Sequence, residues 1–85
     1  MSSPLITLTF INKHRKPVDL YWVNGQENLH ASLKVGERYE QGSQPDLLWV
    51  ARDQGTGRIL TRTRAKADAE IEIIPRNRRL PVKRA

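Results

Sequence analysis

The feature that most constrains the fold is the alternation of apolar and polar residues in short segments bounded by turn residues. Residues 6–10 alternate in this way with β-branched and aromatic types, and residues 18–23 put three apolar side chains on one face, ending with Trp22. A period of two predicts strands with one buried face. Residues 47–51 are apolar at every position, which is typical of a central strand.

The remaining segments complete an all-β pattern. The Asn24-Gly25 dipeptide predicts a two-residue type I′ turn that reverses the chain after residue 23. Residues 42–46 are predicted to be loop, and residues 64–69 are predicted to form an exposed hairpin connection rather than a helical turn. Further strands are expected over residues 27–30, 38–41, 59–63 and 70–74. No segment has a helical period, so we expect an all-β fold, a small antiparallel β-sandwich of about seven short strands with a basic C-terminal tail.

The positive charge of the chain is concentrated at its C-terminal end. The 85 residues carry a formal charge of +6, but residues 1–75 hold ten basic and nine acidic side chains. The other five cations have no acidic neighbour; they are Arg76, Arg78, Arg79, Lys83 and Arg84. The sequence therefore predicts a nearly neutral sandwich domain over residues 1–75 and a basic tail over residues 76–85.

Several function classes lack the residues that they need. The chain has no cysteine and only two histidines, far apart, so no metal site and no cofactor is expected. Ser43, His30 and Asp46 could be drawn as a hydrolytic triad, but no nucleophile-elbow motif accompanies them, and we expect no catalytic residues and no enzyme activity. The N-terminus lacks the pattern of a secretory signal and no apolar run is long enough to span a bilayer. A cytoplasmic protein without membrane association is the expectation.

An ordered set of residues carries a resemblance to a known family. The set includes Trp22, Leu33, Gly36 and Ser43, and its most specific piece is Leu-Trp-Val-x-Arg-Asp at residues 48–53. The other members are Phe10-Ile11-Asn12, Asn24-Gly25 and Gly55-Thr56. In order and spacing, residues 6–74 resemble the β domain of the von Hippel-Lindau tumour suppressor family, with a gap of roughly two residues at the hairpin.

The resemblance implies a peptide-binding site. Well-known members of that family are substrate-recognition subunits of a ubiquitin ligase, and their sandwich binds an extended peptide that contains 4-hydroxyproline. By resemblance, Trp22, Trp49 and Ser43 occupy the positions of two tryptophans and a serine in that pocket. His30 stands where the family has a tyrosine, and Leu47 stands where it has a histidine. Because Leu47 can neither donate nor accept a hydrogen bond, Ser43, with His30 from the hairpin, would have to supply the polar contacts, and selectivity for hydroxyproline is not implied.

Two functions from different classes follow. The first is a non-enzymatic module that binds a protein or peptide, in particular an extended proline- or hydroxyproline-containing peptide, through Trp22, His30, Ser43, Leu47 and Trp49. The alternative is a nucleic-acid-associated protein that binds through the basic tail. No ubiquitin-ligase adaptor is expected, because the helical domain that docks it in the family does not follow the sandwich. Simpler roles stay open: core packing for both tryptophans, a turn for Ser43 and a solvated end for the tail.

Overall fold

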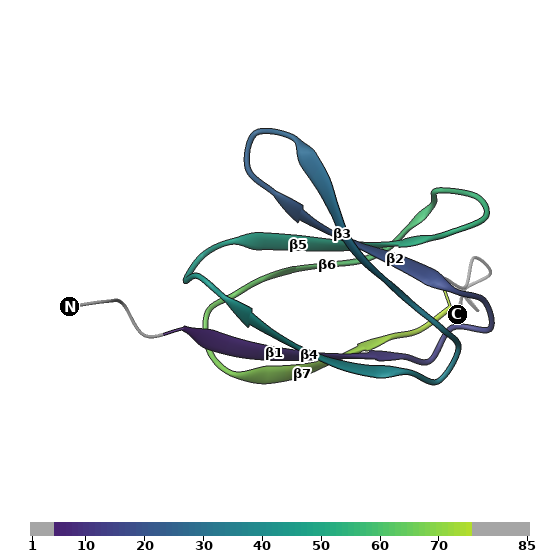
Figure 1. Cartoon of the computed structure of the whole chain (residues 1–85), viewed down its shortest axis with the longest axis horizontal. Coiled ribbons are helices and arrows are strands. Elements are labelled where there is room, and N and C mark those ends of the chain that lie inside the picture. The colour runs from purple at the N-terminus through teal and green to yellow at the C-terminus, as the bar shows by residue number, and fades with distance from the viewer. Residues whose placement is uncertain (1–4, 76–85) are drawn as a thin grey trace, which may run out of the picture.

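The computed structural model describes residues 5–75, which form two facing β-sheets (Figure 1). The strands are β1 (Ile6–Asn12), β2 (Val18–Val23), β3 (Glu27–Leu33), β4 (Arg38–Ser43), β5 (Leu48–Asp53), β6 (Ile59–Arg64) and β7 (Ala69–Ile73). One sheet has the order β4-β1-β7 and the other has the order β3-β2-β5-β6. The predicted all-β sandwich of seven short strands is confirmed.

The strand pairing is antiparallel at four of the five interfaces described. β1 pairs antiparallel with β4. In the second sheet, β2 pairs antiparallel with β3 and with β5, and β5 pairs antiparallel with β6. β7 instead pairs parallel to β1, with Phe10 opposite Ile71. Because β6 belongs to one sheet and β7 to the other, the chain crosses between the sheets after Arg64. The predicted hairpin over residues 64–69 is therefore wrong, although no helix forms there.

The core lies between the sheets and follows the predicted alternation. Phe10 of β1 and Leu20 of β2 are completely buried from opposite sheets. The ring of Phe10 lies 5.9 Å from that of Trp49, centre to centre, in a tilted arrangement that joins the two layers. The other buried members of this cluster are Leu8, Val18, Leu33, Ala51, Ala65 and Ile73. β5 is central, as predicted, with β2 on one side and β6 on the other.

Three local predictions need correction. The β2–β3 loop has three residues, since Val23 pairs with Glu27, and only Gly25 in it has a positive φ (81°), so the predicted type I′ turn is wrong. β4 continues two residues beyond the predicted strand and ends at Ser43, which is buried. Ala65, predicted to lie in an exposed connection, is also fully buried. Its N–H donates to the carbonyl of Leu47, and its side chain belongs to the buried core cluster.

Candidate functional site: a groove at the open end of the sandwich

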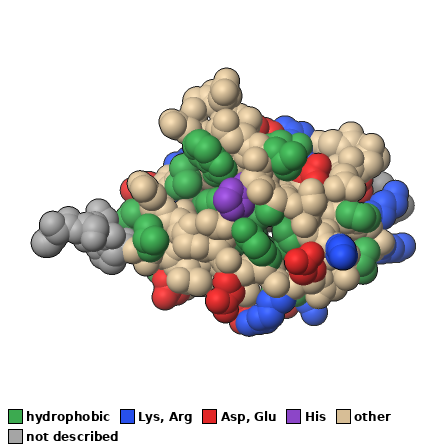
Figure 2. Space-filling model, in the orientation of Figure 1, with side chains coloured by type: hydrophobic (Ala, Val, Ile, Leu, Met, Phe, Trp, Pro, Cys, Tyr) green, Lys and Arg blue, Asp and Glu red, His purple; other side chains and the backbone are tan. Residues whose placement is uncertain are grey.

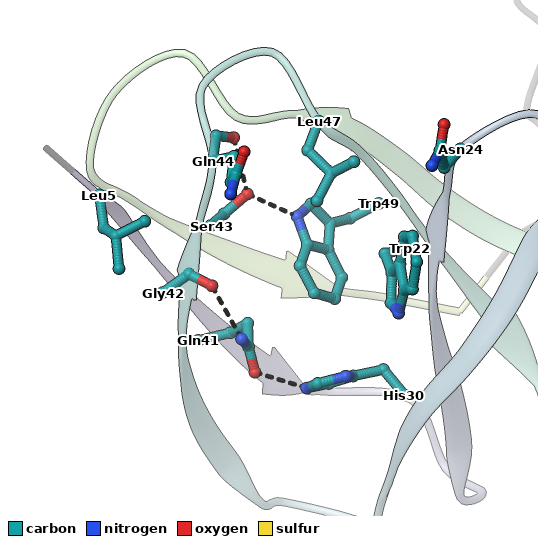
Figure 3. A pocket seen from close by; sticks show the side chains of 10 residues that line it. All are labelled: Leu5, Trp22, Asn24, His30, Gln41, Gly42, Ser43, Gln44, Leu47 and Trp49. Carbon is teal, nitrogen blue, oxygen red and sulfur yellow. Dashed lines mark hydrogen bonds between the residues drawn. The ribbon is translucent and has the colours of Figure 1, made fainter. Parts of the chain in front are cut away.

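A groove of about 480 Å³ opens at the end of the sandwich where β1 begins and β4 ends (Figure 3). It receives side chains from both sheets, and all five residues that the sequence analysis assigned to a peptide site line it. The lining residues are Leu5, Trp22, Asn24, His30, Gln41, Gly42, Ser43, Gln44, Leu47 and Trp49. No Asp, Glu, Lys or Arg is among them, so the groove suits an uncharged group.

The two tryptophans lie side by side because their strands pair in register. Trp22 of β2 is directly opposite Trp49 of β5, and both side chains point to the inner face of the sheet. Trp49 is only 2% exposed and packs against the core, whereas Trp22 is half-buried. Trp49 therefore forms the floor of the groove, and Trp22 offers the indole that a ligand can reach (Figure 3).

Ser43 holds Trp49 in place. The indole Nε1–H of Trp49 donates to Oγ of Ser43 over 2.9 Å in a buried hydrogen bond. The same hydroxyl donates to the carbonyl of Gln44 over 3.0 Å. Ser43 is 2% exposed, so its hydroxyl is already paired on both sides and is barely accessible. It acts here as a positioning residue rather than as a free partner for a ligand hydroxyl.

His30 enters the groove because β3 contains a bulge. Leu20 is opposite Ala31 and Tyr21 is opposite Leu29, which leaves His30 as an extra residue without a partner in the ladder. A bulge of this kind re-aims a side chain, here toward the other sheet. The imidazole Nε2 lies 2.7 Å from Oε1 of Gln41 on β4, and the ring stands edge-on to Trp49 with centres 5.4 Å apart.

A second bond of Gln41 ties this contact to the edge of β4. Its Nε2 donates to the carbonyl of Gly42 over 2.8 Å, and its Oε1 also accepts from the hydroxyl of Tyr39 over 2.9 Å. The side chains of three residues thus form a polar clasp: His30, Tyr39 and Gln41. The clasp connects β3 and β4, the edge strands of the two sheets. It covers one side of Trp49 without closing the groove.

Leu47 completes the apolar side of the groove from the β4–β5 loop. This loop is held by reciprocal backbone bonds, from the N–H of Ala65 to the carbonyl of Leu47 and from the N–H of Asp46 to the carbonyl of Ala65. Asp46 has a φ of 67°, a left-handed conformation that Asp tolerates better than most residues. Leu47 is half-buried against the core cluster. With Leu5 and Trp22 it gives the groove a hydrophobic lining.

Five further lining residues were not predicted from the sequence: Leu5, Asn24, Gln41, Gly42 and Gln44. Only one signal pointed to Gln41: it follows Tyr39 by two positions, which puts both side chains on the same face of a strand. The bulge that brings His30 to Gln41 has no sequence signature that we can identify. The space-filling view shows hydrophobic side chains around a histidine on this face of the molecule (Figure 2).

The basic tail and metal binding were also considered from the sequence. The cations of the tail, Arg76 to Arg84, lie outside the described residues. Within residues 5–75 no group of three or more potential metal-ligating side chains comes together. That part of the chain also contains no helix long and apolar enough to cross a membrane.

Comparisons of the chain with protein-family models and with curated proteins give no match. The resemblance to the von Hippel-Lindau β domain therefore stays a prediction from the residues quoted above.

Proposed function

We propose that this chain is a peptide-binding module that holds one apolar side chain, in particular proline, of an extended segment in the groove between Trp22 and Leu47. The observation that carries the proposal is the convergence of five residues, predicted from sequence to form such a site, on one groove. Proline fits because aromatic faces bind its rigid ring and an extended segment loses little conformational entropy on binding. The proposal includes no catalytic step.

The bound segment runs along the edge of β4. Within the described residues, β4 pairs only with β1, so its other edge is open to a further strand. At this edge Gly42 is exposed and has no side chain to keep a peptide backbone away. Its carbonyl accepts a hydrogen bond from the side-chain amide of Gln41. A backbone N–H of the peptide can take the place of this amide as the donor. This arrangement supports strand addition as the binding mode.

The hydrogen bonding in the groove favours proline over 4-hydroxyproline. Ser43 already uses its hydroxyl on Trp49 and Gln44, and Leu47 offers no polar atom. A buried hydroxyl without a partner costs about 1–3 kcal/mol, so a hydroxyl added to the proline ring weakens binding when it points into the groove. When it faces His30 at the rim, binding is unchanged. The groove is accordingly proposed to require no hydroxylation of its ligand.

The experiment is a selection from peptide libraries on the full-length chain. Random eight-residue peptides with a fixed central proline are displayed beside a library with a fixed central alanine, and both are selected on the wild type, Trp22→Ala and Tyr21→Ala. Tyr21 is the matched control, since it is an equally half-buried aromatic residue on the same strand that faces the other side of the sheet. The proposal expects enrichment from the proline library that Trp22→Ala abolishes and Tyr21→Ala preserves.

Two outcomes contradict the proposal. One is equal enrichment from both libraries, and the other is selected peptides that bind Trp22→Ala within about twofold of the wild type, although an aromatic anchor contributes about tenfold or more. Thermal unfolding of each variant, followed by circular dichroism, shows that the proteins used in the selection are folded.

A further inference from the structure

A second pocket, of about 530 Å³, lies at the opposite end of the sandwich from the groove. It is formed where β1 and β5 end and β2 and β6 begin. The lining residues are His14, Arg15, Lys16, Asp53, Thr56, Arg58, Leu60 and Pro75. Lysine and arginine side chains gather at this end of the molecule, at the right of Figure 2. We call it the basic pocket.

The loop that carries two of its cations is shaped by one buried residue. Asn12, 1% exposed, accepts a hydrogen bond from the N–H of His14 and donates to the carbonyl of Lys16. The two N–H groups of its amide are shared among this carbonyl and those of Leu33, the last residue of β3, and Lys34 in the β3–β4 connection. These bonds fix the backbone on which Arg15 and Lys16 are displayed.

The loop that carries the third cation is shaped in the same way by Asp53. Its Oδ1 accepts hydrogen bonds from the N–H groups of Gly55 and Thr56 over 2.8 and 3.0 Å. The backbone of Arg58 is bonded at both ends, to the N–H of Asp53 through its carbonyl and to Oγ1 of Thr56 through its N–H. Gly57, with a φ of 78°, permits the tight return.

Two contacts join the two loops, and the first is a backbone hydrogen bond from the N–H of Gln54 to the carbonyl of Pro17 over 3.1 Å. The second is between side chains. Nε2 of His14 lies 2.8 Å from Oδ2 of Asp53, and both side chains are nearly buried. This bond, together with the backbone N–H groups of Thr56 and Gly55 and the charge of Lys16, lowers the pKa of Asp53 to about 2. Both carboxylate oxygens are therefore occupied by partners within the protein. Asp53 builds the pocket. Its charge lies near that of Lys16, but its only ion pair in the described part of the chain is with His14, so Arg15 and Arg58 are not paired with it.

None of the three cations forms an ion pair in the described part of the chain. Ion pairs there use other residues: His14 with Asp53, Arg38 with Glu70, Arg52 with Glu27, and Lys66 with Asp46. Arg15, Lys16 and Arg58 therefore present like charges on prearranged loops. The lining thus holds three Lys and Arg cations against one carboxylate, that of Asp53. A concave surface with a net positive charge concentrates anions, and an anion with several oxygens can contact several cations at once.

We infer that the basic pocket binds a phosphate group carried on a small organic body, through Arg15, Lys16 and Arg58. Phosphate is the anion whose several oxygens match two guanidinium forks and an ammonium. The pocket is larger than a phosphate ion alone, and Leu60 and Pro75 give it an apolar wall for the body of the ligand. The inference is independent of the peptide groove and requires no residue of the tail.

Nuclear magnetic resonance of the ¹⁵N-labelled full-length chain tests it, with adenosine 5′-monophosphate, inorganic phosphate and adenosine as the probes. The monophosphate is expected to shift the backbone amide signals of residues 15–16 and 55–58, inorganic phosphate to do so with lower affinity, and adenosine not to do so. Arg15→Gln and Arg58→Gln are each expected to weaken the binding of the monophosphate about tenfold, the effect of losing a charge-assisted hydrogen bond.

Lys66→Gln is the matched control, because it removes the same charge from an exposed side chain at the groove end of the sandwich. It is expected to change the affinity by less than about twofold. The inference is overturned if the shifts are confined to residues 76–85, if Lys66→Gln weakens binding as much as Arg58→Gln, or if no phosphate probe shifts any of these signals. Equal affinity for inorganic phosphate and the monophosphate would contradict the contact with the apolar wall.

Discussion

Replacing Ser43 by alanine tests whether this residue supports the groove rather than contacting the ligand. The substitution leaves the indole N–H of Trp49, which is buried and donates over 2.9 Å, without an acceptor. Leaving a buried donor unpaired costs about 1–3 kcal/mol, and the second bond of the hydroxyl, to the partly exposed carbonyl of Gln44, adds little because water can replace it. The expected loss of unfolding free energy is about 2 kcal/mol.

The assay is urea unfolding followed by tryptophan fluorescence. With a dependence of about 1 kcal/mol per molar urea for a domain of this size, the midpoint falls by about 2 M. In a thermal scan the same loss lowers the melting temperature by roughly 8–16 °C. Ser32→Ala is the matched control: its hydroxyl also bonds a side chain, Oδ1 of Asp19, over 2.7 Å, but at the surface. Its expected effect is below about 0.5 kcal/mol.

Two results would refute the reasoning about Ser43. The first is a destabilisation by Ser43→Ala no larger than that of Ser32→Ala, which would mean that the indole N–H of Trp49 has access to water. The second is a loss of peptide binding under conditions where Ser43→Ala is fully folded and Trp49 keeps its native fluorescence. That result would make Ser43 a direct partner of the ligand.

Three further predictions concern the loops and the surface. Asn12→Ala removes an amide that is hydrogen-bonded to three carbonyls, and it is expected to lower the unfolding free energy by about 3 kcal/mol in the same urea assay. Asn24 is exposed, and Asn24→Ala is expected to change the unfolding free energy by less than about 0.5 kcal/mol. His14 and backbone N–H groups lower the pKa of Asp53 to about 2, so its contribution to stability is complete above pH 4 and is lost as the pH falls toward 2. Asp53→Asn should therefore show a shallower fall of the urea midpoint between pH 4 and pH 2 than the wild type, and equal slopes would contradict this assignment. Glu27→Gln breaks a partly exposed ion pair with Arg52 of β5. A loss of less than about 1 kcal/mol that disappears in 1 M NaCl is therefore expected in a melting experiment with and without salt.

The sequence predicts the sandwich because the alternation of apolar and polar residues along a strand shows which face of that strand is buried. Leu20 and Trp22 lie on the inner face of β2, as the period of two requires, and Val50 is buried on the opposite face of β5 between Tyr21 and Arg62. The parallel pairing of β7 with β1 is different. Alternation specifies which face is buried and carries no information on the partner or direction of a strand.

Half of the residues that line the groove could be predicted from the sequence, and the geometry of the groove could not. The resemblance implied a pocket role for Trp22 and Trp49, and their position side by side follows from the strand register. The role of His30 depends on a bulge, and the burial of Ser43 depends on β4 continuing past a glycine that looked like the start of a loop. Both are set by tertiary packing, which local residue preferences do not encode.

The most direct test of the peptide groove uses its two indole N–H signals, since Trp22 and Trp49 are the only tryptophans in the chain. Full-length ¹⁵N-labelled protein is titrated with a proline peptide from the selection and with the same peptide carrying alanine instead. The account predicts that the proline peptide shifts the indole signal of Trp22 most and that of Trp49 less, because Ser43 holds the latter, with the alanine peptide at least about tenfold weaker. Unchanged indole signals at a peptide concentration that saturates binding would contradict it.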